Sequence, residues 1–187
     1  MAQNMGMGQL ALSNVVFKRK FRWTFQVDGL CSGTRIPEHF VKLASRPNLS
    51  IEETEINFLN GKMWMPGKGS WETITVTDYD VSGSAGGDMA SVYTWIATVY
   101  NSLDSTKLTQ SSKRQDYGGR GTLTLFDGCG TPMETWIMRH MWPQAINFGE
   151  LDYSSSEECT VELTLRYSEV DYQNNCGPQP TACCQGC

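Results

Sequence analysis

The residue types that most often carry out catalysis are sparse in this 187-residue sequence. Its two histidines, His39 and His140, lie far apart, and neither stands at a motif spacing from a cysteine or an aspartate. A lone histidine is usually structural or exposed. No acid, base and nucleophile are assembled into a hydrolase pattern, so we expect no enzymatic activity.

Cysteine-based zinc binding is the next chemistry to consider. Four of the seven cysteines form the pattern C-x6-C-C-x2-C at the end of the chain, as Cys176, Cys183, Cys184 and Cys187. This pattern holds a single C-x-x-C pair and no nearby histidine, which is a weak zinc signature. The beginning of the chain predicts neither a signal peptide nor a membrane span, so reduced thiols are the default. We interpret residues 173–187 as a disordered Cys-rich tail.

Two further patterns resemble ligand sites only superficially. Glu52, Glu53 and Glu55 would alternate between the faces of a strand, which favours solvated charge over a metal site. The GGRG run at residues 118–121 lacks the preceding strand and following helix of a phosphate-binding loop. We expect no cofactor and no metal.

The distribution of charge along the chain is uneven. Residues 1–50 carry seven bases and two acids (+5), residues 51–149 seven bases and eleven acids (−4), and residues 150–187 one base and seven acids (−6), which gives the net charge of −5. A chain that is basic at one end and acidic at the other can pair with copies of itself. Ordinary surface solvation explains the same pattern, and the two alternatives stay open at this stage.

Most of the chain has the alternation of apolar and polar residues that predicts half-buried β-strands. Hydrophobic residues make up 40% of the chain, with six Trp, seven Tyr and seven Phe, which favours aromatic-rich sheets in one domain. Strands are predicted over residues 21–27, 120–127, 133–142 and 158–170. A shorter strand-like run begins at residue 39, and Pro47 bends or ends it.

The middle of the chain offers two competing turns. Asn60-Gly61 suits a tight hairpin, but residues 66–69 offer another turn six residues later. We favour the later turn, with residues 56–65 as one long strand, Gly61 as a bulge, and residues 70–81 as its partner. Ile74 and Val76 would then share one face of that partner.

One amphipathic helix is expected after this strand. Asp88 is a good N-cap residue, and apolar residues recur at helical spacing at Met89, Val92, Tyr93, Ile96, Val99 and Tyr100, with Trp95 and Leu103 extending the buried side. Six or more strands, one helix and no βαβ alternation predict a mainly β fold, an antiparallel β-sandwich or barrel with one flanking α-helix. Residues 1–17 would form an N-terminal arm and residues 18–172 the β domain.

The segment MWPQAINFGELDY, residues 141–153, is interpreted as a chain reversal. Trp142 supplies a large amphipathic plug, Pro143 fixes the backbone, and Gly149 permits a close approach before the last strand.

The order of these elements resembles the tail tube protein of contractile-tailed bacteriophages. The pieces that carry the resemblance are RWTFQV, FLNGKMWMPGKGSWETITVTDYD, DMASVYTWIATVYN, GTLTLFDG and MWPQAINFGELDYSSSEECTVELTLRYSEVDY. It covers residues 21–172, and Gly61 stands where the family more often has a side chain. The inner tubes of type VI secretion and of phage-tail-like bacteriocins share the plan.

The resemblance implies that the chain is a structural subunit of the virion, assembled in the host cytoplasm. Copies would form hexameric rings that stack into a hollow tube inside a contractile sheath. The inner wall would be a continuous barrel of strands, through which double-stranded DNA leaves the capsid. Implied partners are further copies of the chain, the sheath protein, the baseplate tube initiator, the tape measure protein and the tail terminator, with no membrane.

This interpretation assigns candidate contact residues. We expect much of the ring and stacking contact from residues 52–80 and from the polar loop 104–119. The candidate interface residues are Asn60, Lys62, Trp64, Lys68, Trp71, Lys113, Arg114, Tyr117, Trp142 and Glu150. The candidate lumen-facing residues are Thr122, Thr124, Glu162 and Thr164. The acidic segment that begins at Glu150 suits either a surface that meets a neighbour's basic first segment or a lining that does not hold DNA.

Two alternatives remain. The first is the inner tube of a phage-tail-like secretion or bacteriocin device. The second belongs to another class: a β-sandwich carbohydrate-binding module in which Trp64, Trp71 and Tyr79 stack on sugar rings.

Overall fold

Two antiparallel layers share one long strand in this protein. The structure, a computed structural model, describes residues 17–28, 35–81, 89–100 and 117–175. Sheet A consists of β1 (Trp23–Asp28), β6 (Gly119–Phe126), the first part of β7 (Pro132–Asn147) and β9 (Glu169–Asn174). Sheet B consists of the last part of β7, β8 (Thr160–Arg166), β5 (Ile74–Tyr79) and β2 (Val41–Ala44). A 3-10 turn, η3 (Glu38–Phe40), precedes β2.

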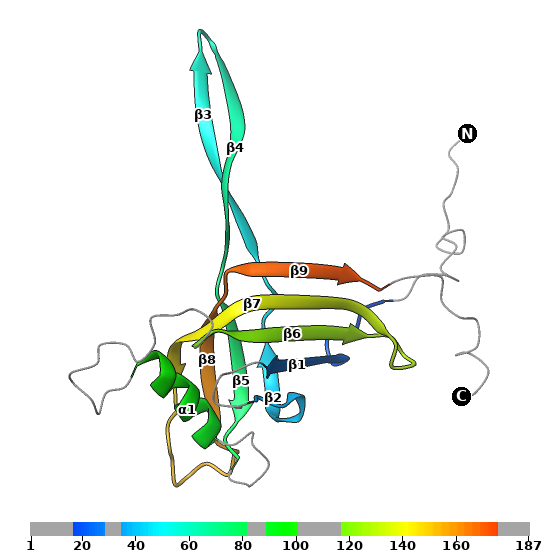
Figure 1. The fold of residues 1–187 in the computed structure, drawn as a ribbon, viewed down its shortest axis with the longest axis vertical. Helices are drawn as coiled ribbons and strands as arrows, with labels where there is room; N and C mark the ends of the chain where they lie inside the picture. Colours follow the sequence, from blue (N-terminus) through cyan, green and yellow to red (C-terminus); the bar gives the residue numbers. More distant parts are fainter. Residues whose placement is uncertain (1–16, 29–34, 82–88, 101–116, 176–187) are drawn as a thin grey trace.

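The strands of the two sheets cross steeply in Figure 1, which is the arrangement of an orthogonal β-sandwich. The alternation in the sequence sets which side chains face inward: Leu123 and Leu125 on β6, Ile74 and Val76 on β5, and Val161, Leu163 and Leu165 on β8 are all buried. The expected fold class, an antiparallel sandwich with a flanking helix, is confirmed.

The corner between the sheets lies at His140. Glu134–Arg139 of β7 pair with β9, whereas Trp142–Asn147 pair with β8. His140 between them has φ +54, a left-handed conformation that side chains with a Cβ adopt less often. The buried methionines on either side, Met138 and Met141, are three residues apart rather than two, so the alternation of the strand is broken where it changes sheets.

Trp142 and Pro143 therefore lie inside β7, and the expectation of a chain reversal at this pair is wrong. The backbone bends at His140, and Pro143 coincides with a register irregularity between itself and Ala145. The reversal comes later, after Asn147, and there Gly149 has φ +74 and a position where a Cβ would lie 2.9 Å from the Thr160 carbonyl oxygen. The expected tight approach at Gly149 is confirmed.

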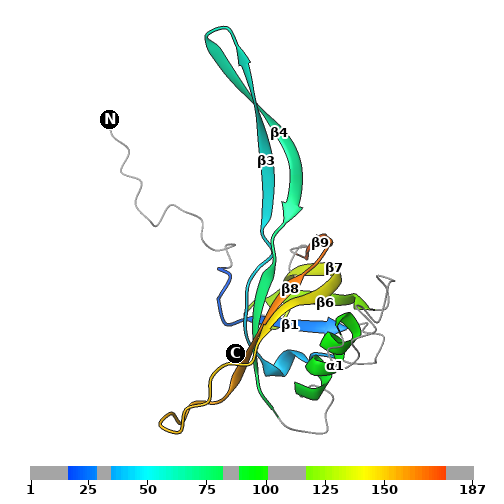
Figure 2. The same cartoon turned by 90° about the vertical axis from the view of Figure 1, so that its left-hand side faces the viewer.

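The helix α1 (Met89–Val99) closes one side of the sandwich (Figures 1 and 2). Val92 and Trp95 are buried, and the Trp95 Nε1 donates a hydrogen bond to the Tyr117 carbonyl oxygen at 2.9 Å. Tyr93 and Tyr100 are exposed, so the predicted apolar stripe is only partly correct. Trp95 is buried as predicted. Asp88, the expected N-cap, and Leu103 lie outside the described residues.

The expected turn at residues 66–69 is wrong. β3 (Leu49–Phe58) and β4 (Gly61–Trp71) form a hairpin whose two-residue turn is Leu59-Asn60. Leu59 takes the positive φ, +50, that closes the turn, and Gly61 pairs with Phe58 in the ladder instead of forming a bulge. As a result β5 pairs with β8 and β2, not with residues 56–65.

The strand predicted over residues 158–170 is divided in two. β8 ends at Arg166, and after Tyr167 and Ser168 the chain continues as β9 in sheet A as far as Asn174. Pro47 lies where predicted, in the link between β2 and β3. Within the described ranges, no helix is long and apolar enough to span a membrane.

Candidate assembly surfaces

The β3–β4 hairpin projects far from the sandwich in both views (Figures 1 and 2). Every residue of β3 is exposed, and so is every residue of β4 except Trp71. An isolated two-stranded hairpin is marginally stable in water. Its length and exposure therefore indicate a segment that is completed by contact with another molecule.

The hairpin has an apolar face near its tip. Side chains paired across two strands lie on the same face, and faces alternate along each strand. Ile56 pairs with Met63 and Thr54 with Met65, while Phe58 lies two residues beyond Ile56. We call Ile56, Phe58, Met63 and Met65 the apolar hairpin face. These side chains are 43–75% exposed, and exposed apolar clusters of this kind mark interaction sites.

The opposite face of the hairpin is polar. Lys62 pairs with Asn57 in the ladder, and its Nζ lies 2.6 Å from the Glu55 Oε1. Trp64 is on this face too, because it pairs with Glu55.

A buried carboxylate fastens the root of the hairpin to the sandwich. Glu134 at the start of β7 is 2% exposed and accepts hydrogen bonds from Lys18 Nζ and Arg46 Nη2. Burial alone would raise the pKa of Glu134, but the hydrogen bond from Lys18 and the positive charges of Arg46 and Lys18 lower it below its ordinary value. The ring of Trp71, 6.3 Å from that of Tyr167, adds an apolar anchor.

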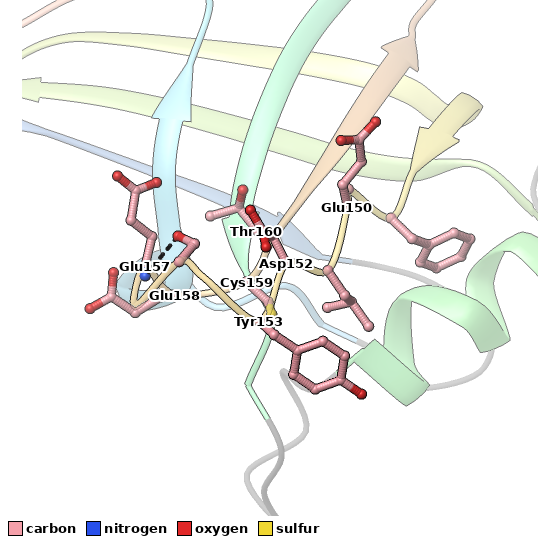
Figure 3. A pocket seen from close by; sticks show the side chains of 11 residues that line it. Glu150, Asp152, Tyr153, Glu157, Glu158, Cys159 and Thr160 are labelled. Atoms are coloured by element: carbon pink, nitrogen blue, oxygen red, sulfur yellow. Dashed lines mark hydrogen bonds between the residues drawn. The ribbon is translucent and has the colours of Figure 1, made fainter.

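An acidic loop of residues 148–160 joins β7 to β8 (Figure 3). It surrounds a cavity of about 530 Å³ and carries four carboxylates and no base, at Glu150, Asp152, Glu157 and Glu158. Asp152 Oδ1 accepts from the Ser154 amide at 2.9 Å, and its Oδ2 accepts from the Ser154 hydroxyl at 2.8 Å. These two bonds hold the pKa of Asp152 below its ordinary value and give the loop a defined shape.

A second cavity, of about 340 Å³, lies between the edge strands β1 and β2. Its apolar lining comes from Trp23, Leu43, Ala44, Leu123 and Leu125, and its polar lining comes from four bases, Lys18, Arg19, Lys20 and Arg46. We call this cavity the basic groove.

The outer face of sheet A is rich in small polar side chains. Thr24, Thr124 and Thr135 are paired side by side across three strands, and Gln26 and Thr122 form the next row. This face also carries Asp28, Glu169 and Asp171 against Arg120 and Arg139, and Arg35 contacts Asp28 and Gln26 on it, so three acids meet three bases and the net charge is 0. It is therefore polar and neutral overall.

One buried acid lies inside the sandwich. Asp78 on β5 is 5% exposed, and within the described part of the chain neither of its carboxylate oxygens has a hydrogen-bond partner. Burial raises its pKa to about 7. In the described residues, no group of three or more His, Cys, Asp or Glu side chains is placed to hold a metal ion.

The structure gathers part of the predicted interface and scatters the rest. Asn60, Lys62, Trp64 and Lys68 are in the projecting hairpin, and Trp71 is at its root. Glu150 is in the acidic loop. Trp142 is half-buried beside Arg166 on the outer face of sheet B, and Tyr117 is half-buried near α1. Lys113 and Arg114, with most of the loop 104–119, lie outside the described residues.

The four predicted lumen residues belong to two different faces. Thr122 and Thr124 are on the outer face of sheet A, whereas Glu162 and Thr164 are on the outer face of sheet B. Because the sheets pack back to back, the two pairs point away from each other.

Trp64, Trp71 and Tyr79 do not form one sugar-binding platform. Trp64 pairs with Glu55 and Trp71 pairs with Leu49 on β3. These two β3 positions are six residues apart, which corresponds to roughly 20 Å along the strand. Tyr79 is at the far end of β5 and lies beneath Lys42, whose Nζ is 5.3 Å from the ring centroid. The carbohydrate-binding alternative loses its main support.

Sequence reasoning missed the apolar hairpin face and the clamp at Glu134. The first was detectable: placing the turn at residues 59–60 pairs Ile56 with Met63 at once. The second had no local signal, because Lys18 before β1, Arg46 between β2 and β3, and Glu134 on β7 are brought together only in the folded chain.

The sequence matches no protein-family model and no curated protein. Solved structures are similar. A chain of the anti-feeding prophage baseplate, 6-fold symmetrised, aligns with a TM-score of 0.67 at 13% identity, covering 86% of this chain and 97% of that one. A chain of the sheath/tube terminator of an extracellular contractile injection system aligns with a TM-score of 0.64 at 21% identity, covering 86% of this chain and 99% of that one. A chain of a sheath-tube complex of such a system in the extended state aligns with a TM-score of 0.62 at 20% identity, covering 90% of this chain and 98% of that one.

At these identities the likeness concerns the fold. It extends over nearly the whole length of each matched chain and over 86–90% of this one. The resemblance found in the sequence is confirmed at that level: this chain has the same fold as chains of contractile injection systems.

Proposed function

We propose that this chain is the structural subunit of a hollow tube, in which copies close into six-membered rings and the rings stack inside a contractile sheath. The observation that carries the proposal is the β3–β4 hairpin, which is fully exposed and presents Ile56, Phe58, Met63 and Met65 on one face. A monomer gains nothing from this exposed apolar surface, whereas a neighbouring ring would bury it. Met side chains suit such a contact because they adapt to the surface they meet.

In this proposal the outer face of sheet A lines the bore. Threonine and glutamine rows on a face of net charge 0, where Arg35 and Arg139 are paired with Asp28 and Asp171, offer DNA or another cargo few free cationic contacts. Each Lys or Arg that binds phosphate would slow its passage. Thr122 and Thr124 face the bore, while Glu162 and Thr164 on sheet B face outward. The outer face of sheet B carries larger side chains, including Trp142 and Arg166, which suits contact with protein.

The likeness to chains of a sheath-tube complex and of a sheath/tube terminator supports a place inside a contractile sheath. The same likeness favours one specific alternative within the class: the tube of a phage-tail-like injection device, whose cargo is not a genome. Both versions make the chain a non-enzymatic structural protein that forms part of a particle.

The test is assembly of the purified protein at rising concentration, followed by light scattering and negative-stain images. Wild-type protein should give six-membered rings or hollow tubes. A variant with Ile56→Ser and Met63→Ser should keep the thermal stability of the monomer but lose stacking. Persistent monomers of the wild type, also in the presence of a candidate initiator, would contradict the proposal.

A matched control lies one residue along the same hairpin. Asn57 and Lys62 form the next cross-strand pair, on the polar face. Asn57→Ser with Glu55→Ser changes two residues on that polar face, neither of them a candidate interface residue, and this variant should still stack. Equal loss of stacking in both variants would show that the hairpin acts through its fold and not through its apolar face.

A further inference from the structure

The basic groove leaves part of the core within reach of another molecule. β1 and β2 are the edge strands of the two sheets, and between them lie Leu123 and Leu125, with Trp23 and Leu43 beside them. Leu43 is 58% exposed. A cavity with apolar side chains inside and charged ones around it suits a partner with the reverse arrangement: apolar tips flanked by opposite charge.

The charge around the groove is positive. Lys18 and Arg46 share the buried carboxylate of Glu134, while within the described residues Arg19 and Lys20 have no ion-pair partner. Four bases and one acid give +3. The groove therefore favours an acidic partner.

The acidic loop of residues 148–160 has the matching properties. It carries four acids and no base, a charge of −4. Its large apolar side chains face solvent: Phe148 is 52% exposed and Leu151 86%, and Tyr153 is fully exposed. In Figure 3 the Tyr153 ring points away from the loop, and the carboxylates of Glu150 and Glu157 extend from the other side of the loop. The internal hydrogen bonds of Asp152 and Ser154 hold this shape before any partner binds, which lowers the entropy lost on docking.

The loop cannot occupy the groove of its own chain. Ser45, next to Arg46, bonds to Thr75 at the beginning of β5, whereas Cys159 at the end of the loop bonds to Asp80 just beyond β5. The two anchor points, Thr75 and Asp80, are five residues apart along the chain, about 17 Å at 3.3 Å per residue. Only a second copy can bring a loop to the groove.

We infer that residues 148–160 of one copy dock into the basic groove of the next copy. The patches differ, so the contact is heterologous: each copy uses its loop on one side and its groove on the other. Repetition of a heterologous contact gives a closed ring when the rotation closes and an open filament when it does not. The contact itself is independent of the proposed tube, but its closure into rings rests on that proposal.

Charge reversal on each side separately tests the contact. The groove variant carries Arg19→Glu and Lys20→Glu, which leaves the Glu134 clamp intact, and the loop variant carries Glu157→Lys and Glu158→Lys. All four side chains are exposed. Each variant alone should raise the critical concentration for assembly by roughly tenfold or more, because the groove variant sets a loop of −4 against a groove of −1 and the loop variant lowers the charge of the loop to 0.

An equimolar mixture of the two variants is the decisive sample. In the mixture the unaltered loop of the groove variant (−4) meets the unaltered groove of the loop variant (+3), while the altered loop (net charge 0) is not repelled by the altered groove (−1). An alternating ring with an even number of copies can therefore form. The mixture should assemble at a lower concentration than either component alone. Failure of the mixture, or normal assembly of either variant alone, would overturn the inference.

Two controls separate this result from other causes. Glu38→Lys with Glu72→Lys changes the net charge as much as the loop variant does, at two exposed acids outside both surfaces, and should assemble normally. If the wild type forms no rings, sedimentation at low salt still tests the contact. Association of the mixture, but of neither variant alone, would support loop docking even though the proposed tube is contradicted. If the mixture does not associate either, loop docking is overturned together with the tube.

Discussion

The sandwich and the β3–β4 hairpin place the same kinds of side chain in opposite environments. Leu163 in β8 is fully buried, whereas Leu59 at the hairpin turn is 91% exposed. Both segments are β-strands that pair regularly with a neighbouring strand. The difference teaches that hydrogen-bonded strands alone do not identify what a segment is for: sheets A and B stabilise the monomer by burying apolar area, and the hairpin keeps its apolar area for a partner.

The largest expected effect comes from making the same substitution, Leu to Ala, in the sandwich and in the hairpin. Leu163→Ala should lower the free energy of unfolding by about 2–5 kcal/mol, because it opens a cavity in the core. Leu59→Ala should change it by less than about 0.5 kcal/mol. Urea unfolding followed by circular dichroism measures both. Similar losses at the two positions would mean that the hairpin packs on the monomer in solution, contrary to the structure.

A second test concerns the buried acid of the sandwich. The pKa of Asp78 is raised from 3.8 to about 7 by burial, so the folded state binds its proton more tightly than the unfolded state does. Its contribution to stability is therefore full below pH 4 and declines as the pH rises to 7, by about 1.4 kcal/mol per pH unit. Asp78→Asn should remove this decline from the pH profile of unfolding.

The control for Asp78 is the exposed Asp80, two residues along the chain. Asp80→Asn should leave the profile of the wild type unchanged. If Asp78→Asn and wild type gave parallel curves from pH 4 to pH 7, the carboxylate would be solvated or paired, and the sandwich would be less tightly closed than its burial indicates.

The smallest expected effect on the free energy of unfolding comes from removing a carboxylate that forms an ion pair, once in the sandwich and once in the hairpin. Glu134→Gln removes the clamp between the sandwich and the root of the hairpin and should cost about 1–3 kcal/mol, since a buried charge-assisted network is lost. Glu55→Gln removes an exposed pair in the hairpin and should cost about 0–1 kcal/mol. Urea unfolding at pH 7 measures the two losses, and hydrogen exchange should additionally show faster opening at Leu49 and Trp71 only in Glu134→Gln.

The pH dependence of the clamp runs opposite to that of Asp78. Because the pKa of Glu134 is lowered from 4.5, its stabilisation is present above pH 4.5 and is lost as the pH falls through the lower, folded-state value. The difference in free energy of unfolding between wild type and Glu134→Gln should therefore be smaller at strongly acidic pH than at neutral pH. The same difference at both pH values would contradict an ionised clamp.

Much of the sandwich could be predicted from local patterns. Leu123 and Leu125 alternate with threonines, and Val161, Leu163 and Leu165 alternate with threonines, a glutamate and an arginine, so burial on one face fixes their orientation. The hairpin was predicted less well, because Asn60-Gly61 and residues 66–69 both suit a turn. Nothing buries either face of that hairpin within the monomer, so burial did not decide its register, although Ile56 and Met63 pair on an apolar face once the turn is placed at residues 59–60.

By itself the sequence determined the fold class, the inward residues of β5, β6 and β8, the tight approach at Gly149 and the separation of basic and acidic segments, because each depends on the types of neighbouring residues. Only the tertiary structure decided the corner at His140, the clamp of Lys18 and Arg46 on Glu134, and the separation of Thr122 and Thr124 from Glu162 and Thr164. These depend on which strands pair across long stretches of chain, and on a strand changing sheets, which the periodicity of a single strand does not encode.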